Sequence, residues 1–285
     1  MSTSSLTLLE RVNFLLTNRV PRYYLTLFVG WLSKIENPVI SSLSIFTWRL
    51  FVDDLRLEEA EKSSFKSMHD CFTRRLKPGA RPIDTAENVL VSPCDAVVGE
   101  FGKVRDCQVL QAKGFPYSIK ELIDDEGLAA TYSGGHYITL RLKSSMYHRF
   151  HAPCDAHARS INYISGDTWN VNPVALKCIE SLFCRNERIV LQLHGNEPAG
   201  SILLVPVAAI LVASMRIHGL SEPFNLKYRG ANVISCDLNY SKGDEIGYFE
   251  HGSTIIMFTG AQWRFDDALK TGTTIRMGQR VMTVS

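Results

Sequence analysis

Residues 198–215 read PAGSILLVPVAAILVASM, and the interpretation of these 18 consecutive uncharged residues decides the fold. Their length lies at the lower limit for a helix that crosses a bilayer. Pro206 stands in the middle of the stretch, loop-forming His194, Gly195 and Asn196 precede it, and valine and isoleucine are frequent in it. These features are typical of one or two buried strands. We therefore predict buried β-structure here and reject a transmembrane span.

The chain after residue 66 repeats this pattern on a smaller scale. Short runs rich in Val, Ile and Leu alternate with Gly, Pro and Asp, which indicates a predominantly β domain. The predicted strands include 89–91, 96–98, 137–142, 189–193, 202–212 and 255–258. A weaker helical pattern spans residues 173–183. We therefore predict an α+β fold, in which N-terminal amphipathic helices in residues 1–65 precede a mostly antiparallel, barrel- or sandwich-like β domain in residues 66–285.

Three apolar stretches make up the N-terminal part. Leucine and valine recur at helical spacing in residues 6–17, with charged Glu10 and Arg11 between them, so we predict one short amphipathic helix that ends before Pro21. Residues 23–31 are rich in aromatic rings, and residues 39–52 form the third stretch. None reaches the roughly 20 uncharged residues that a bilayer span requires. The helices therefore either lie in a membrane interface or pack on a protein core.

Composition excludes several classes of protein. The chain has 285 residues, of which 45% are apolar and 21% charged, which is enough for a sizeable core. The formal net charge of +2 disfavours a nucleic-acid partner. The seven cysteines are odd in number, form no CxxC pair and follow no secretory signal. We therefore expect unpaired, structural thiols in a cytosolic compartment.

Three residue types that activate a hydroxyl occur at the ends of predicted strands. Asp95 precedes an apolar run, His148 and His151 lie just before Pro153, and Ser253 begins another run. In such a set an aspartate orients a histidine, and the histidine removes the serine proton. The two histidines lie on opposite faces of a regular strand and lack further ligands at metal-site spacing, so no metal site is expected. Taken alone, these residues are equally consistent with a turn aspartate, two structural histidines and a Gly-Ser turn.

The ordered motifs of the chain resemble those of the prokaryotic-type phosphatidylserine decarboxylases. They include SPCDAVV at 92–98, YHRFHAP at 147–153 and NERIV at 186–190. Further matching blocks are 21–33, 72–84, 111–122 and 242–256. The family's self-cleavage motif is best known with leucine before Gly-Ser-Thr, and this chain has His251 there. The Gly252-Ser253 pair is intact.

The resemblance implies a proenzyme that cuts itself between Gly252 and Ser253 into residues 1–252 and 253–285. Ser253 attacks the Gly252 carbonyl, His151 acts as its base, and Asp95 orients His151. Glycine offers no Cβ to obstruct the attack. Elimination and hydrolysis then leave a covalent pyruvoyl group at residue 253. This group, the only cofactor expected, forms a Schiff base with the substrate amine and accepts the electrons released as CO2 leaves.

The same resemblance implies the substrate and the location. The substrate is phosphatidylserine in the membrane, the product is phosphatidylethanolamine, and His148 is the expected proton donor. A diacyl lipid stays in its bilayer, so the resemblance favours membrane docking by the N-terminal helices. We expect a peripheral protein on the cytoplasmic face of the bacterial cell membrane. The two cleavage fragments are expected to form a heterodimer, which could pair further into a homodimer.

Two rival functions remain open at this point. A serine hydrolase would use Asp95, His151 and Ser253 without cutting itself, and a fluorophosphonate would label Ser253 in an intact chain. A lipid-binding or carrier module, suggested by the turn at 243–247 before a strand, would show neither cleavage nor CO2 release.

Overall fold

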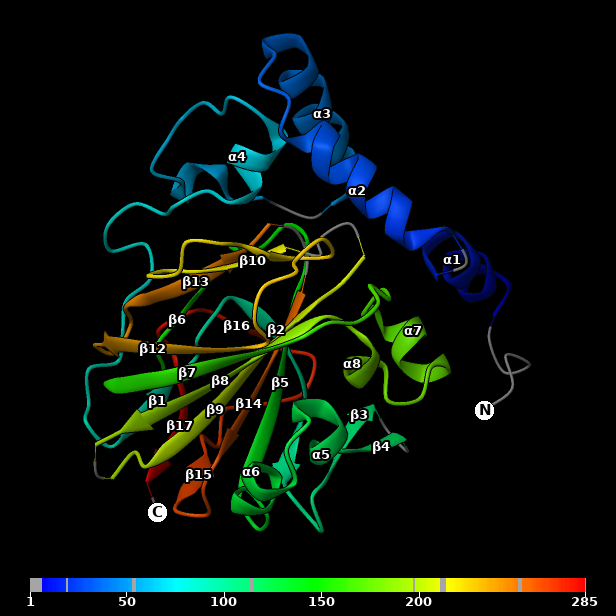
Figure 1. Cartoon of the computed structure of the whole chain (residues 1–285). Coiled ribbons are helices and arrows are strands. Elements are labelled where there is room, and N and C mark those ends of the chain that lie inside the picture. Colours follow the sequence, from blue (N-terminus) through cyan, green and yellow to red (C-terminus); the bar gives the residue numbers. More distant parts are fainter. Residues whose placement is uncertain are drawn as a thin grey trace.

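The computed structural model describes residues 7–18, 20–52, 55–112, 115–196, 198–210, 214–250 and 253–284. Three N-terminal helices lie along one end of the β-rich body (Figure 1). They are α1 (Leu8–Asn18), α2 (Arg22–Ser33) and α3 (Pro38–Phe51). The Asn37 side chain caps α3 by accepting hydrogen bonds from the backbone N–H groups of Val39 and Ile40, and Pro38 fits the first turn because no partner is needed there for its nitrogen.

An eight-stranded sheet forms the centre of the body. Its strands follow the order β12 (Val233–Tyr240), β7 (Ala156–Ile164), β8 (Arg188–Gly195), β9 (Ser201–Ala208), β14 (Ser253–Thr259), β5 (His136–Leu142), β2 (Ala96–Lys103) and β16 (Thr274–Ile275). All neighbouring strands in it are antiparallel. The predicted α+β class is confirmed. The sheet is open, with β12 and β16 at its edges, and is not a closed barrel.

Smaller elements surround this sheet. A four-stranded sheet orders β11 (Phe224–Asn225), β10 (Ser214–Ile217), β13 (Glu245–Phe249) and β6 (Arg149–His151). A three-stranded sheet orders β1 (Val89–Val91), β17 (Arg280–Val284) and β15 (Trp263–Phe265), and β3 (Gln108–Ala112) pairs with β4 (Phe115–Ser118). The short helices are Leu57–Glu59, α4 (Met68–Phe72), α5 (Ile119–Ile123), α6 (Glu126–Thr131), α7 (Pro173–Cys178) and α8 (Leu182–Arg185).

The uncharged stretch at 198–215 contains strands, as predicted, but the strand expected at 202–212 ends at Ala208, and residues 211–213 lie outside the described residues. The stretch supplies β9, which is buried between β8 and β14, and the start of β10. Within the described ranges, no helix is both long enough and apolar enough to cross a membrane. The single helix expected at 173–183 was wrong in its extent, because Ser181 adopts a left-handed conformation with φ of 49° and separates α7 from α8.

Strand β14 is buried along its whole length. All seven of its residues are buried, and it is hydrogen-bonded on one side to β5 and on the other to β9. A separate buried cluster joins α3 to α4 through Trp48, Leu55, Cys71 and Phe72. All seven cysteines are free, which confirms the expectation of unpaired thiols.

Charged contacts connect α2 to the β-rich body. The guanidinium of Arg22 donates from Nε and Nη2 to the Asp167 carboxylate at 3.1 and 2.5 Å, and its Cζ lies 3.6 Å from the centre of the Trp169 ring. Such two-pronged contact fixes orientation as well as distance. The helical layer is therefore held in a defined position beside the sheet.

Gly247 of β13 tests how closely β13 and its neighbour β10 approach each other. A Cβ at this position would lie 2.0 Å from the carbonyl oxygen of Arg216, whereas a Cβ at Gly102 of β2 would lie 3.9 Å from its nearest neighbour, on Tyr137. Gly247→Ala is expected to lower the free energy of unfolding by about 2–3 kcal/mol, since backbone must move. Gly102→Ala should change it by less than about 1 kcal/mol. Urea denaturation measures the free energy of unfolding of both variants. Equal unfolding midpoints would contradict the close approach of the Arg216 carbonyl to Gly247.

Candidate active site

Ser253 is the first residue of β14 and lies between two strand ends. Its Cα partners are Leu142 of β5 and Ala208 of β9. The residue is fully buried, and its Oγ makes no hydrogen bond within the described part of the chain. A buried hydroxyl without a partner is energetically unfavourable, and a catalytic role is one of the recognised explanations for such a group. Gly252 and His251, which precede it, lie outside the described residues.

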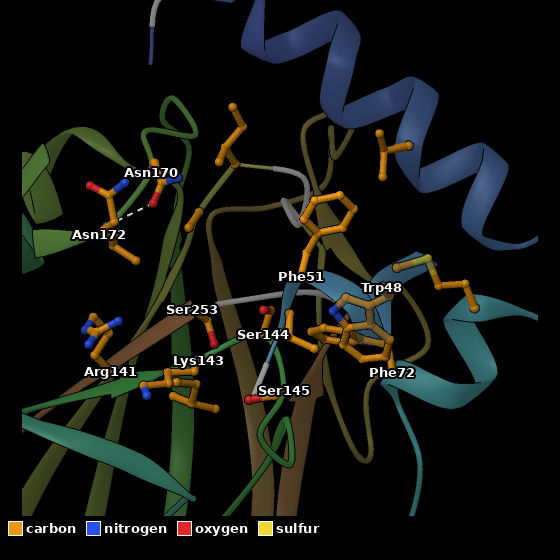
Figure 2. Close-up of a pocket in the computed structure, with 17 residues that line it drawn as sticks. Trp48, Phe51, Phe72, Arg141, Lys143, Ser144, Ser145, Asn170, Asn172 and Ser253 are labelled. Atoms are coloured by element: carbon orange, nitrogen blue, oxygen red, sulfur yellow. Dashed lines mark hydrogen bonds between the residues drawn. The ribbon is translucent and has the colours of Figure 1, made fainter. Parts of the chain in front are cut away.

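A cavity of about 530 Å³ opens over Ser253. In Figure 2 the serine lies between a polar group of side chains and an aromatic group. Arg141, Lys143, Asn170 and Asn172 belong to the polar group, and Trp48, Phe51 and Phe72 belong to the aromatic group. The aromatic residues come from α3 and α4, so the helical layer forms one wall of the cavity. A cavity with one polar and one apolar side suits an amphipathic ligand.

His148 lies immediately before β6 and is fully buried. Its Nδ1 donates to the carbonyl oxygen of Met146 at 2.7 Å, because a carbonyl can only accept. Its ring packs against Phe72 with the ring centres 4.0 Å apart, and Phe72 lines the cavity. The imidazole therefore lies directly behind the aromatic wall.

His151, the last residue of β6, is held at both ring nitrogens. Nδ1 donates to the carbonyl oxygen of Gly243 at 2.8 Å, so in the neutral ring Nε2 carries no proton and accepts from the Tyr147 hydroxyl at 3.0 Å. Burial lowers the pKa of His151 below its usual value, and the hydrogen bond to Gly243 opposes this only in part. The structure thus holds a neutral imidazole in the tautomer that can accept a proton at Nε2.

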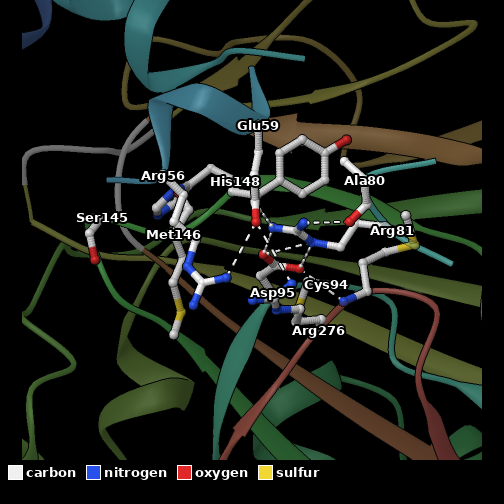
Figure 3. Close-up of polar contacts among 12 residues, drawn as sticks. Arg56, Glu59, Ala80, Arg81, Cys94, Asp95, Ser145, Met146, His148 and Arg276 are labelled. Atoms are coloured by element: carbon white, nitrogen blue, oxygen red, sulfur yellow. Dashed lines mark hydrogen bonds and ion pairs between the residues drawn. The ribbon is translucent and has the colours of Figure 1, made fainter. Parts of the chain in front are cut away.

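Asp95 lies in the turn before β2, as predicted, but its carboxylate contacts arginine (Figure 3). Arg81 donates to it from Nε at 2.9 Å and from Nη2 at 2.6 Å, and the backbone N–H of Met277 donates at 2.9 Å. The same Arg81 Nη2 lies 2.7 Å from the Glu59 carboxylate. Across the described ranges, Asp95 makes no hydrogen bond to His151.

The structure therefore places Ser253 and His148 at the cavity, and it gives Asp95 and His151 separate hydrogen-bond partners. Ser253 opens onto the cavity, His148 lies behind its wall, and His151 is bound by Gly243 and Tyr147. Sequence reasoning gave no role to Arg81, Tyr147 or Gly243. Tyr147 and Arg81 lie in the quoted blocks 147–153 and 72–84, but nothing in the spacing indicated which groups they would contact.

Comparison with known proteins supports a single family. The sequence model described as phosphatidylserine decarboxylase matches residues 68–283. A phosphatidylserine decarboxylase proenzyme of Methylibium petroleiphilum is 36% identical over 277 residues, covering 95% of this chain and 96% of that protein. Proenzymes of the same name from Aliivibrio fischeri and a Polaromonas species are 34% and 35% identical, covering 90% and 91% of this chain and 93% and 94% of theirs. The chain belongs to the phosphatidylserine decarboxylase family.

Proposed function

We propose that this enzyme cuts itself between Gly252 and Ser253 and then converts phosphatidylserine to phosphatidylethanolamine and CO2. The observation that carries the proposal is the position of Ser253, whose unengaged hydroxyl opens onto a cavity with one polar and one aromatic side. Membership of a family whose relatives are named as proenzymes supports both the decarboxylation and the precursor state.

Self-cleavage begins at the Ser253 hydroxyl. Oγ attacks the Gly252 carbonyl carbon, the C–N bond between the two residues breaks, and the acyl group moves to Oγ as an ester. The Oγ proton passes to the base and then to the released nitrogen. Loss of the Ser253 α-proton expels the Gly252 carboxylate and leaves dehydroalanine, which takes up water and loses ammonia to give the pyruvoyl group.

His151 is the proposed base for the attack. It is neutral and unprotonated at Nε2, and it acts when Ser253 Oγ replaces the Tyr147 hydroxyl at that nitrogen. Asp95 supports it through its charge, because a nearby carboxylate favours the imidazolium formed during the transfer. On this proposal Gly243 takes the orienting role that the sequence assigned to Asp95.

The residues around Ser253 fit a pyruvoyl group and a lipid headgroup. Bound at residue 253, the group supplies a ketone that accepts electrons as CO2 leaves. Arg141 and Lys143 provide positive charge for the anionic headgroup, and Trp48 and Phe51 provide apolar surface for its acyl side. His148, behind the Phe72 wall, is the proposed donor of the proton that replaces the carboxylate.

The outer face of the helical layer is the proposed membrane contact. Among the described residues, 16 large apolar side chains are exposed, and 14 of them lie on α1, α2 and α3. Thirteen of them form the proposed contact, and Phe51 lines the cavity instead; the thirteen are Leu8, Leu9, Val12, Leu15, Tyr23, Tyr24, Phe28, Trp31, Leu32, Val39, Leu43, Phe46 and Leu50. Such a concentration is typical of helices that lie in a bilayer interface. We place the protein on the cytoplasmic face of the bacterial cell membrane, where its seven free thiols stay reduced.

The cleavage proposal is tested by denaturing mass measurement of wild type and Ser253→Ala. Wild type is expected as two fragments, the smaller without a free N-terminal amine, and Ser253→Ala as one intact chain. Ser144→Ala, which removes another serine hydroxyl from the same cavity, should still cleave. An intact wild type whose Ser253 reacts with a fluorophosphonate would instead establish the serine hydrolase.

His151 and His148 are expected to act in different steps, the first in self-cleavage and the second in decarboxylation. His151→Ala should leave the chain uncleaved, because no base remains for Ser253. His148→Ala should cleave as wild type does but lose about 10²–10⁴-fold in the rate of CO2 release, as removal of a general acid predicts. Gel analysis and trapped 14CO2 measure the two steps. Equal defects of both variants in cleavage would contradict the separate roles.

Membrane contact is tested by sedimentation with phosphatidylserine-containing vesicles. Trp31→Ser is expected to weaken binding about 10- to 100-fold, since burial of such a side chain contributes about 1.5–3 kcal/mol. Val233→Ser on the edge strand β12 is the matched control, because Val233 and Trp31 are both 63% exposed. Equal binding by Trp31→Ser and Val233→Ser would place the contact on another face.

A further inference from the structure

Glu250 lies between the last residue of β13 and the proposed cleavage point. Phe249 ends β13, and Ser253 begins β14 three residues after Glu250. Its backbone N–H donates to the carbonyl oxygen of Ser214 at 3.0 Å, and only 7% of its side chain is exposed. The side chain thus carries a buried charge next to the segment that the enzyme must cut.

Three basic side chains from three elements converge on this carboxylate. Lys34 Nζ, at the C-terminal end of α2, lies 2.7 Å from it, Arg216 Nε of β10 lies at 3.9 Å, and His69 Nε2 of α4 lies at 4.0 Å. Burial tends to raise the pKa of Glu250, but the hydrogen bond and charge of Lys34 lower it below its usual value. Lys34 donates a hydrogen bond to the carboxylate, and the Ser214 side chain of β10 also bonds to it, so α2 and β10 together hold the carboxylate in place.

Lys34 is itself fixed by α2. Its backbone N–H bonds to the carbonyl oxygen of Trp31, and Val29 of the same helix lines the cavity over Ser253. The Arg22 contact with Asp167 holds the other end of α2 against the body. A rigid helix therefore connects the cavity wall to the Glu250 carboxylate.

Both ends of the cleavage segment are consequently anchored. Glu250 is bound by Lys34 and by Ser214, and Ser253 is bound by β5 and β9. His251 and Gly252 lie outside the described residues, but three peptide units span at most about 11 Å. Anchoring both ends limits where the Gly252 carbonyl can lie relative to Ser253 Oγ, and attack requires the two within about 3–3.5 Å.

We propose that Glu250 and Lys34 are positioning residues for self-cleavage, through which α2 sets the approach of the Gly252 carbonyl to Ser253. The inference rests on the proposed function and adds residues outside the Asp95, His151 and Ser253 set. Neither residue touches the reacting atoms. Their effect falls on the first step, ester formation, because that step depends on the approach of the two groups.

The test follows cleavage of newly made full-length chain in a cell-free translation reaction. Lys34→Met and Glu250→Gln are each expected to slow cleavage about tenfold, since small misplacements of reacting groups cost at least this much. Lys34→Arg, which keeps the charge, should restore the wild-type rate to within about twofold. Lys62→Met is the matched control, because Lys62 forms a similar pair with Asp70 at 2.9 Å and is 60% exposed, against 50% for Lys34.

Hydroxylamine distinguishes slow formation of the ester from a defect in the steps that follow it. It attacks the ester carbonyl of Gly252, forms a hydroxamate there and releases the Ser253 hydroxyl, so it completes cleavage wherever the ester has formed. Slow cleavage of Lys34→Met that hydroxylamine does not accelerate is the expected result. Acceleration to the wild-type rate would overturn the inference, because the ester would then form normally.

The other results of these experiments distinguish failure of this inference from failure of the proposed function. Wild-type rates in both Lys34→Met and Glu250→Gln, or an equal loss in Lys62→Met, would overturn the inference while leaving the proposed function in place. Melting temperatures of the cleaved variants equal to that of wild type are expected, and a general loss of stability would also overturn it. A wild-type chain that never cleaves would overturn the proposed function itself.

Discussion

The complete pairing of β14 is the constraint on which the rest of the molecule depends. Every residue of this strand is buried, so its backbone N–H and C=O groups have to be bonded within the protein. Strands β5 and β9 provide those bonds from Ser253 onward. A cut before Ser253 leaves the pairs from Thr254 to Thr259 in place. On the proposed function, the fragment 253–285 therefore stays in the sheet, and the reactive group at its first residue stays at the cavity.

The helical layer has two surfaces with different physical roles. Its helices carry most of the exposed large apolar side chains of the described chain, and Trp48 and Phe51 of α3 supply part of the aromatic wall of the cavity. Ion pairs at Arg22 and Lys34 fix α2 to the body at both of its ends.

Charge around the proposed base is arranged to keep it neutral. His151 is buried and bonded to a backbone carbonyl, while the Asp95 carboxylate is neutralised by Arg81. A carboxylate bonded directly to the ring would favour the imidazolium more strongly. Holding Asp95 on Arg81 therefore keeps His151 able to accept a proton, and Asp95 contributes at longer range when the imidazolium forms.

The sequence by itself determined several of the central strands and suggested the candidate site residues. The runs at 89–91, 137–142 and 255–258 form strands because buried apolar runs bounded by Gly, Pro and Asp fit few other structures. The ordered motifs indicated Asp95, His148, His151 and Ser253. The tertiary structure alone decided their partners. His151 binds Gly243, 92 positions away, and Lys34 binds Glu250, 216 positions away. Local spacing carries no information on such contacts, because they depend on how distant strands and helices pack. The break at Ser181 has the same origin, since packing there overrides a helical pattern.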